Sequence, residues 1–167
     1  MSADTGYSNL IYLSLGSNLG DRLKNIDAAR ELIWKRLGNP GVVSQVFESA
    51  SWGYTSDNLF YNCCLSLTTN LDPISVMDEI LDIEKILGRE RGTIGYSDRL
   101  IDIDLLFFGD LILDHPRLTI PHPSIPQRRF ILEPLSKIAP DLIHPEYGIA
   151  ILTMLEQCKD QGAVRPI

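Results

Sequence analysis

The sequence predicts an α+β fold whose strands and helices follow one another in the order βαββαβ. Runs of residues typical of buried strands begin near residues 9, 42, 60 and 100, and two segments between them carry apolar residues at helical spacing. At 167 residues with 44% hydrophobic content, the chain is long enough for one cooperative core and short for two. We therefore expect a single domain over residues 1–167.

The first strand and helix are predicted within residues 9–37. Asn9–Leu15 is a nearly continuous apolar run, and the turn after it offers Asn18 or Asp21 as a helix cap. The helix should continue to about Leu37, and the sequence GNPG at residues 38–41 should end it. Its apolar residues recur at helical spacing, namely Ile26, Ala29, Ile33 and Leu37.

Two strands and a second helix follow. Val42–Phe47 and Phe60–Thr68 are strand-like, and the polar segment between them is too long for a tight hairpin, which makes it a candidate functional loop. Asp72 and Pro73 should begin the second helix as N-cap and first-turn proline, and Gly88 should follow its end.

A fourth strand over Leu100–Phe108 completes the ferredoxin-like arrangement, in which a four-stranded antiparallel sheet carries two helices on one face. The chain then continues as a C-terminal extension. We expect residues 114–126 to be irregular and short helices to follow over Phe130–Ile138 and Ile149–Cys158. This topology hosts many activities, so the fold alone predicts no function.

Composition excludes several classes of protein. A net charge of −7 argues against a nucleic-acid or membrane-surface binder. No apolar run approaches the roughly 20 residues that span a bilayer, and the first residues lack the order of a secretory signal, so we expect a cytoplasmic protein. Cys63 and Cys64 should point to opposite faces of a strand and Cys158 is remote, which predicts neither disulfides nor a zinc site.

The most informative motif is Asp102-Ile-Asp104 in the fourth strand. Apolar residues alternate with the two acids, so both carboxylates should project from one face, roughly 6.5 Å apart along the strand. Such a pair beside a sheet core is costly to desolvate unless cations neutralise it. Hard oxygen ligands favour Mg²⁺, which normally binds together with phosphates. The alternative is a strand whose polar face simply meets water.

Arginines gather around this pair although the chain is acidic. Six of the fifteen basic residues flank it in sequence, and they are Arg89, Arg91, Arg99, Arg117, Arg128 and Arg129. Together they fit a polyphosphate bridged to metal ions, although any one of them could be an ordinary surface residue. The segment from Gly88 to Arg99 has little apolar content, so we expect it to become ordered only when ligands bind.

Several motifs together resemble the family of 6-hydroxymethyl-7,8-dihydropterin pyrophosphokinases over about Leu10–Pro145. They are Gly16-Ser-Asn-Leu19, Phe60-Tyr-Asn62, Glu84 with Gly88-Arg89, Arg99-Leu-Ile-Asp-Ile-Asp104, Arg117-Leu-Thr-Ile-Pro-His122 and Arg128-Arg-Phe-Ile-Leu-Glu-Pro-Leu135. The resemblance implies transfer of the terminal pyrophosphate of ATP to the pterin hydroxymethyl group, with release of AMP, in folate biosynthesis. It implies ATP and the pterin as partners, and we expect a monomer.

The resemblance also implies residue roles. Asp102 and Asp104 correspond to ligands of two Mg²⁺ ions and, with Arg89 and Arg99, to catalytic positions. The ATP contacts implied are Arg89, Arg99, Arg117, Arg128, His122 and Tyr96. The pterin contacts implied are Ser49, Ala50, Trp52, Phe60, Asn62 and Phe130, although both phenylalanines could be core aromatics and Glu84 could support an arginine. One departure stands out: Tyr96-Ser-Asp-Arg99 occupies the place of Trp-Gly-Pro-Arg in many members.

Two alternative functions remain open at the level of sequence. A regulatory domain of the same topology could sense a nucleotide without chemistry, but such a domain has no use for paired acids ringed by arginines. Nucleotidyl transfer also uses two-metal aspartate sites, and it would release inorganic pyrophosphate instead of AMP.

Overall fold

The computed structural model describes residues 8–88 and 96–167. Arg89, Arg91 and most of the segment expected to order with ligands therefore lie outside the described residues. None of the helices within the described ranges is long and apolar enough to cross a membrane.

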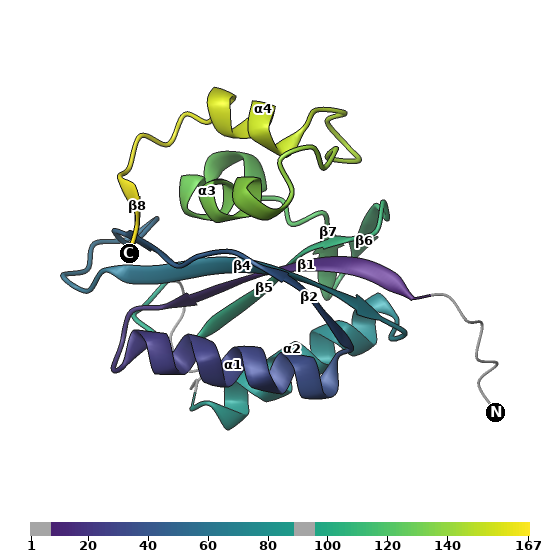
Figure 1. The fold of residues 1–167 in the computed structure, drawn as a ribbon, viewed down its shortest axis with the longest axis horizontal. Helices are drawn as coiled ribbons and strands as arrows, with labels where there is room; N and C mark the ends of the chain where they lie inside the picture. Colours follow the sequence, from purple (N-terminus) through teal and green to yellow (C-terminus); the bar gives the residue numbers. More distant parts are fainter. Residues whose placement is uncertain (1–7, 89–95) are drawn as a thin grey trace.

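A six-stranded antiparallel sheet forms the centre of the molecule, in the order β5-β1-β4-β3-β8 with β2 also paired to β4 (Figure 1). Its strands are β1 (Asn9–Ser17), β2 (Asn39–Val43), β3 (Phe47–Ser49), β4 (Phe60–Thr69), β5 (Asp102–Phe108) and β8 (Val164–Pro166). The central part is the predicted ferredoxin-like arrangement, so the fold class is confirmed.

Helices cover both faces of the sheet, as Figure 1 shows. α1 (Arg22–Arg36) and α2 (Pro73–Ile86) lie on one face, and the side chains between them and the sheet form the larger hydrophobic core. α3 (Arg129–Ile138) and α4 (Ile151–Gln157) cover the other face over a second core that includes Phe107. The C-terminal extension thus buries the face that the βαββαβ core alone would leave exposed.

The helix starts follow the sequence closely. Asp21, one of the two predicted caps, accepts a hydrogen bond from the Lys24 backbone N–H at the start of α1. Asp72 caps α2 as predicted, by accepting from the Ser75 backbone N–H. Asn18 caps neither helix, and its amide instead reaches residues far along the chain.

The predicted strand over Val42–Phe47 was wrong in its limits. The structure has two strands there, β2 and β3, because Ser44 interrupts the pairing with β4. The Cys64 backbone N–H donates to the Ser44 hydroxyl oxygen at 3.0 Å instead of to a backbone carbonyl. Pro40, expected to end a helix, lies within β2, where an edge position tolerates its missing N–H.

The C-terminal extension is more regular than expected. A small hairpin, β6 (Leu113–His115) and β7 (Leu118–Ile120), and a 3-10 turn at Ile125–Gln127 occupy the stretch predicted to be irregular. β8 was not predicted, because its side chains supply little of the core and its pairing partner β3 is more than a hundred residues earlier. The two short helices were predicted, within two residues at each end.

Candidate active site

A pocket lies where β1, β4 and β5 meet the start of α3 and two segments that are neither helix nor strand. Fourteen residues line it: Ser14, Gly16, Ser49, Ala50, Trp52, Tyr54, Phe60, Asn62, Tyr96, Arg99, Asp102, Asp104, Arg128 and Phe130. Most of the side chains singled out from sequence are among them. We call Arg99, Asp102, Asp104 and Arg128 the acidic end, together with His122, which lies beside Asp104 outside this lining. Ser49, Trp52, Phe60, Asn62 and Phe130 form the aromatic end.

Strand pairing places the two carboxylates of the acidic end. Asp104 is opposite Ser14 and Asp102 is opposite Gly16 in the β1–β5 ladder. The alternating Ile103 and Leu105 are buried, whereas about a quarter of each aspartate side chain is exposed. Both carboxylates therefore project from the same face of the sheet into the pocket, as the Asp-x-Asp spacing predicts.

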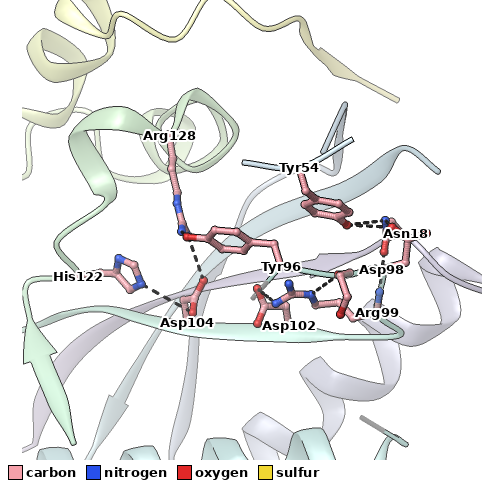
Figure 2. Close-up of polar contacts among 10 residues, drawn as sticks. Asn18, Tyr54, Tyr96, Asp98, Arg99, Asp102, Asp104, His122 and Arg128 are labelled. Carbon is pink, nitrogen blue, oxygen red and sulfur yellow. Dashed lines mark hydrogen bonds and ion pairs between the residues drawn. The ribbon is translucent and has the colours of Figure 1, made fainter. Parts of the chain in front are cut away.

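Cationic side chains approach both carboxylates from different elements (Figure 2). Arg99 Nη1 is 3.3 Å from Asp102 Oδ2, and Arg128 Nη1 is 3.9 Å from Asp104 Oδ2. Neutralisation by these guanidinium groups offsets the cost of holding two carboxylates close together beside the core.

His122 faces Asp104 as a neutral imidazole. Burial, together with the nearby Arg128 guanidinium, lowers the pKa of His122 to about 4, although Asp102 opposes the shift. Nδ1 accepts from the Ser124 backbone N–H at 3.2 Å, so the ring proton belongs on Nε2. That Nε2–H points toward Asp104 Oδ1 at 3.9 Å, which is too long for a direct hydrogen bond.

Arg128 joins the two ends of the pocket. Its guanidinium lies 4.8 Å from the Trp52 ring centre and 5.7 Å from that of Phe130, and Nη2 donates to the Tyr96 hydroxyl. Only 8% of the residue is exposed, and within the described residues its Nε has no hydrogen-bond acceptor. A buried donor without an acceptor is costly in a protein interior, so this nitrogen is available to a bound ligand.

The aromatic end rests on β3, β4 and the start of α3. Ser49 and Phe60 are paired across β3 and β4, and Asn62, only 2% exposed, donates from Nδ2 to the Ser49 hydroxyl at 2.8 Å. Gly16 leaves space beside Asn62, since a Cβ there would lie 3.2 Å from Asn62 Oδ1. A flat heterocycle with polar edges matches such a lining of aromatic faces and one fixed amide.

The two aspartates offer carboxylate oxygens, the kind of ligand that Mg²⁺ prefers. Across residues 8–88 and 96–167, no three His, Cys, Asp or Glu side chains form a group that could hold a metal ion. Mg²⁺ in phosphate-transferring sites characteristically takes one or two carboxylates and completes its shell with phosphate oxygens and water. The donor set on β5 therefore fits Mg²⁺ that arrives with a polyphosphate.

Not every residue named from sequence lies at the pocket. Arg117 is exposed, and its guanidinium pairs with Asp78 of α2. Glu84 is buried in α2, and Arg89 lies outside the described residues.

Other pocket residues were missed by sequence reasoning. Ser14 and Gly16 line the pocket through the β1–β5 pairing, and the strand pattern could have suggested them. Tyr54 lies in the polar loop between β3 and β4, whose length was the only signal.

Comparisons with known proteins agree with one another. The model of the 7,8-dihydro-6-hydroxymethylpterin-pyrophosphokinase family matches residues 12–140. A 2-amino-4-hydroxy-6-hydroxymethyldihydropteridine pyrophosphokinase of Porphyromonas gingivalis is 41% identical over 140 residues, which cover 82% of this chain and 95% of that protein. A folic acid synthesis protein of Pneumocystis carinii is 37% identical over 158 residues, which cover 94% of this chain.

The chain is shorter than some of these proteins. It spans 21% of the Pneumocystis protein and 24% of a similar protein of Dictyostelium discoideum. Among solved structures, a Plasmodium falciparum HPPK-DHPS chain superposes with a TM-score of 0.76 at 17% identity, over 93% of this chain and 46% of that one. At this identity the structural likeness establishes the fold alone.

Proposed function

The chain belongs to the 7,8-dihydro-6-hydroxymethylpterin-pyrophosphokinase family, and we propose that it transfers the terminal pyrophosphate of ATP to the hydroxymethyl group of 6-hydroxymethyl-7,8-dihydropterin. The products are AMP and the pterin diphosphate, an intermediate for folate biosynthesis. One observation carries the proposal: the carboxylates of Asp102 and Asp104, two arginines and the residues of the aromatic end all line the same pocket.

At the acidic end, Asp102 and Asp104 are proposed to hold two Mg²⁺ ions together with the phosphates of ATP. Bound Mg²⁺ supplies Lewis-acid polarisation and neutralises the charge that develops on the transferred group. Arg99 now pairs with Asp102, and its guanidinium can exchange that carboxylate for a phosphate as the metal binds. Arg128 and the Nε2–H of His122 are proposed to donate to phosphate oxygens near Asp104.

At the aromatic end, Phe60 and Phe130 are proposed to stack on the two faces of the pterin, with Trp52 covering it. Asn62 offers both a donor and an acceptor to the polar ring edge, and Ser49 and Ala50 add main-chain contacts. This arrangement would present the hydroxymethyl oxygen toward Asp102 and Asp104. Orientation of that oxygen in line with the β-phosphorus supplies much of the catalysis in reactions of this kind.

Three further parts of the proposal rest mainly on sequence and resemblance. Arg89 and Arg117 are proposed to contact ATP, although Arg117 would first have to leave Asp78. Tyr96, which lines the pocket, is proposed to lie beside the nucleotide. We also propose that residues 1–167 act as one domain, as a monomer in the cytoplasm, without a nucleic-acid or membrane partner.

Incubation with ATP, Mg²⁺ and 6-hydroxymethyl-7,8-dihydropterin tests the proposal. We expect pterin-dependent AMP formation that stops when a chelator removes the metal. Release of inorganic pyrophosphate in place of AMP would indicate nucleotidyl transfer, and the absence of ATP consumption would indicate a binding domain.

A further inference from the structure

The Asp98 carboxylate joins three segments that are far apart in sequence (Figure 2). Its Oδ1 accepts hydrogen bonds from Asn18 Nδ2 and from the Tyr54 hydroxyl, both at 2.9 Å, and its Oδ2 accepts from Asn58 Nδ2 at 2.7 Å. These donors are neutral groups, as is the hydroxyl of Ser56, which also donates to this carboxylate. Hydrogen bonding from Ser56, and then from Asn18, Asn58 and Tyr54, lowers the pKa of Asp98 to about 2 against the opposing effect of desolvation, so the carboxylate is charged at neutral pH.

The first segment held by Asp98 is the polar loop at residues 52–58. Tyr54 stacks parallel to Tyr96 with ring centres 6.5 Å apart, and Trp52 meets the edge of the same ring at 6.1 Å. Gly53 has a φ of +79°, and a Cβ on it would lie 3.2 Å from the Tyr96 ring. The loop backbone therefore packs directly on Tyr96. Asp98, two residues later in the chain, accepts hydrogen bonds from the same loop.

The second connection leads to the backbone of Arg99. Asn18 is 3% exposed, and because its NH₂ group faces Asp98, its Oδ1 faces the other way and accepts from the Arg99 backbone N–H at 2.8 Å. The Asn18 backbone N–H in turn donates to the Arg99 carbonyl at 3.1 Å. Asp98 thus fixes the orientation of an amide that clamps Arg99, whose side chain reaches Asp102.

We propose that Asp98 is a positioning residue for the transfer reaction. Its carboxylate holds Tyr54, Asn58 and the Asn18 amide against residues 96–99, and thereby fixes Arg99 and Tyr96 in the lining of the pocket. The inference rests on the proposed function for its catalytic consequence, but the contacts that carry it are independent of that function. Asp98 itself touches no reacting atom; it acts through the residues that it orients.

The test compares Asp98→Asn with Asp57→Asn, which removes the same charge from an exposed position in the 52–58 loop that Asp98 contacts. Replacement of the carboxylate by an amide places an N–H group where an oxygen now accepts a hydrogen bond. The contacts with Asn18, Tyr54 and Asn58 therefore cannot all be kept in their present form. Because a misplacement of about 1 Å can cost about a hundredfold in rate, we expect Asp98→Asn to lower kcat by ten- to a hundredfold. Asp57→Asn should stay within twofold of the unsubstituted protein.

Amide exchange of Arg99 provides a readout that does not depend on turnover. Its N–H donates to Asn18, so in NMR exchange experiments on the ligand-free protein we expect at least about tenfold faster exchange in Asp98→Asn and no change in Asp57→Asn. If the unsubstituted protein forms no AMP but this exchange difference is present, the proposed function fails while the positioning contact stands. Unchanged exchange at Arg99 would overturn the inference even in an active enzyme.

A double-mutant cycle guards against simple misfolding. Tyr54→Phe keeps the ring stack and removes two hydrogen bonds of the network, the one that the hydroxyl donates to Asp98 and the one that it accepts from Asn18. Residues joined in one network show non-additive effects. We expect Asp98→Asn to lower kcat by a smaller factor in the Tyr54→Phe background than in the unsubstituted protein. Additive losses in kcat, or a loss that follows the thermal unfolding midpoint in every variant, would contradict a positioning role.

Discussion

The two aspartates of the acidic end and the two outermost aromatic residues of the aromatic end, Trp52 and Phe130, are held in different ways. Asp102 and Asp104 lie at the start of β5, where pairing with Gly16 and Ser14 of β1 fixes their direction. Trp52, by contrast, belongs to a loop without regular structure, and Phe130 belongs to the first turn of α3. Substitutions of the two aspartates should therefore change chemistry without changing geometry, whereas substitutions that disturb the loop around Trp52 should change geometry first.

The largest expected effect is at the acidic end. Asp104→Asn keeps the size of the side chain and the β1–β5 pairing but removes a charged oxygen ligand, so we expect turnover to fall by at least about a hundredfold with little change in the thermal midpoint. Asp110→Asn, at an exposed position in the turn after β5, is the matched control. A loss of less than about tenfold, or ~1.4 kcal/mol, would contradict a metal-binding role for Asp104.

Arg99→Ala should affect the use of ATP much more than the binding of the pterin. The side chain contacts Asp102 and not the aromatic end, so we expect kcat/KM for ATP to fall by about thirtyfold, or ~2 kcal/mol, within the range for loss of a hydrogen bond to a charged group. Pterin affinity, measured by fluorescence titration without ATP, should stay within about threefold. Arg30→Ala, on α1 and paired with Asp27, controls for the loss of one positive charge. Equal weakening of both ligands would argue that Arg99 shapes the whole pocket.

This division also explains what could be predicted from the sequence. The alternation around Asp102 and Asp104 is a property of one local strand, so the sequence alone indicates where both carboxylates point. The contacts of Asp98 with Tyr54 and Asn18 span 44 and 80 residues, and no local periodicity encodes them. Ser44 illustrates the same limit in the fold, because the bond that divides β2 from β3 is made with a strand twenty residues away.

The lowered pKa of His122 predicts how the free energy of unfolding depends on pH. Its folded-state pKa of about 4 lies below the usual value near 6.5, so between these pH values the unfolded chain binds more protons and stability rises with pH. Acidification from pH 7 to 5 should therefore cost about 1–2 kcal/mol through this histidine. In His122→Asn that part of the pH dependence should disappear, as measured by denaturant unfolding without ligands. His115→Asn, at an exposed histidine, should keep the original slope; identical slopes in all three proteins would show that His122 titrates normally.

The smallest effect is expected from Ser49→Ala at the aromatic end. The Ser49 hydroxyl is the acceptor for the buried Asn62 amide, and its loss leaves an N–H without a partner at a cost of about 1 kcal/mol. Because Asn62 can then rotate, pterin affinity should fall about fivefold while the KM for ATP changes little. Ser66→Ala is the matched control. Ser66, on β4, is buried like Ser49 but lies outside the pocket lining, and its hydroxyl accepts one hydrogen bond, from the Val42 backbone N–H. Both variants should lose similar stability, but only Ser49→Ala should weaken the pterin. If the two serine variants bind pterin equally well, the Ser49–Asn62 contact supports the sheet and does not orient the ligand.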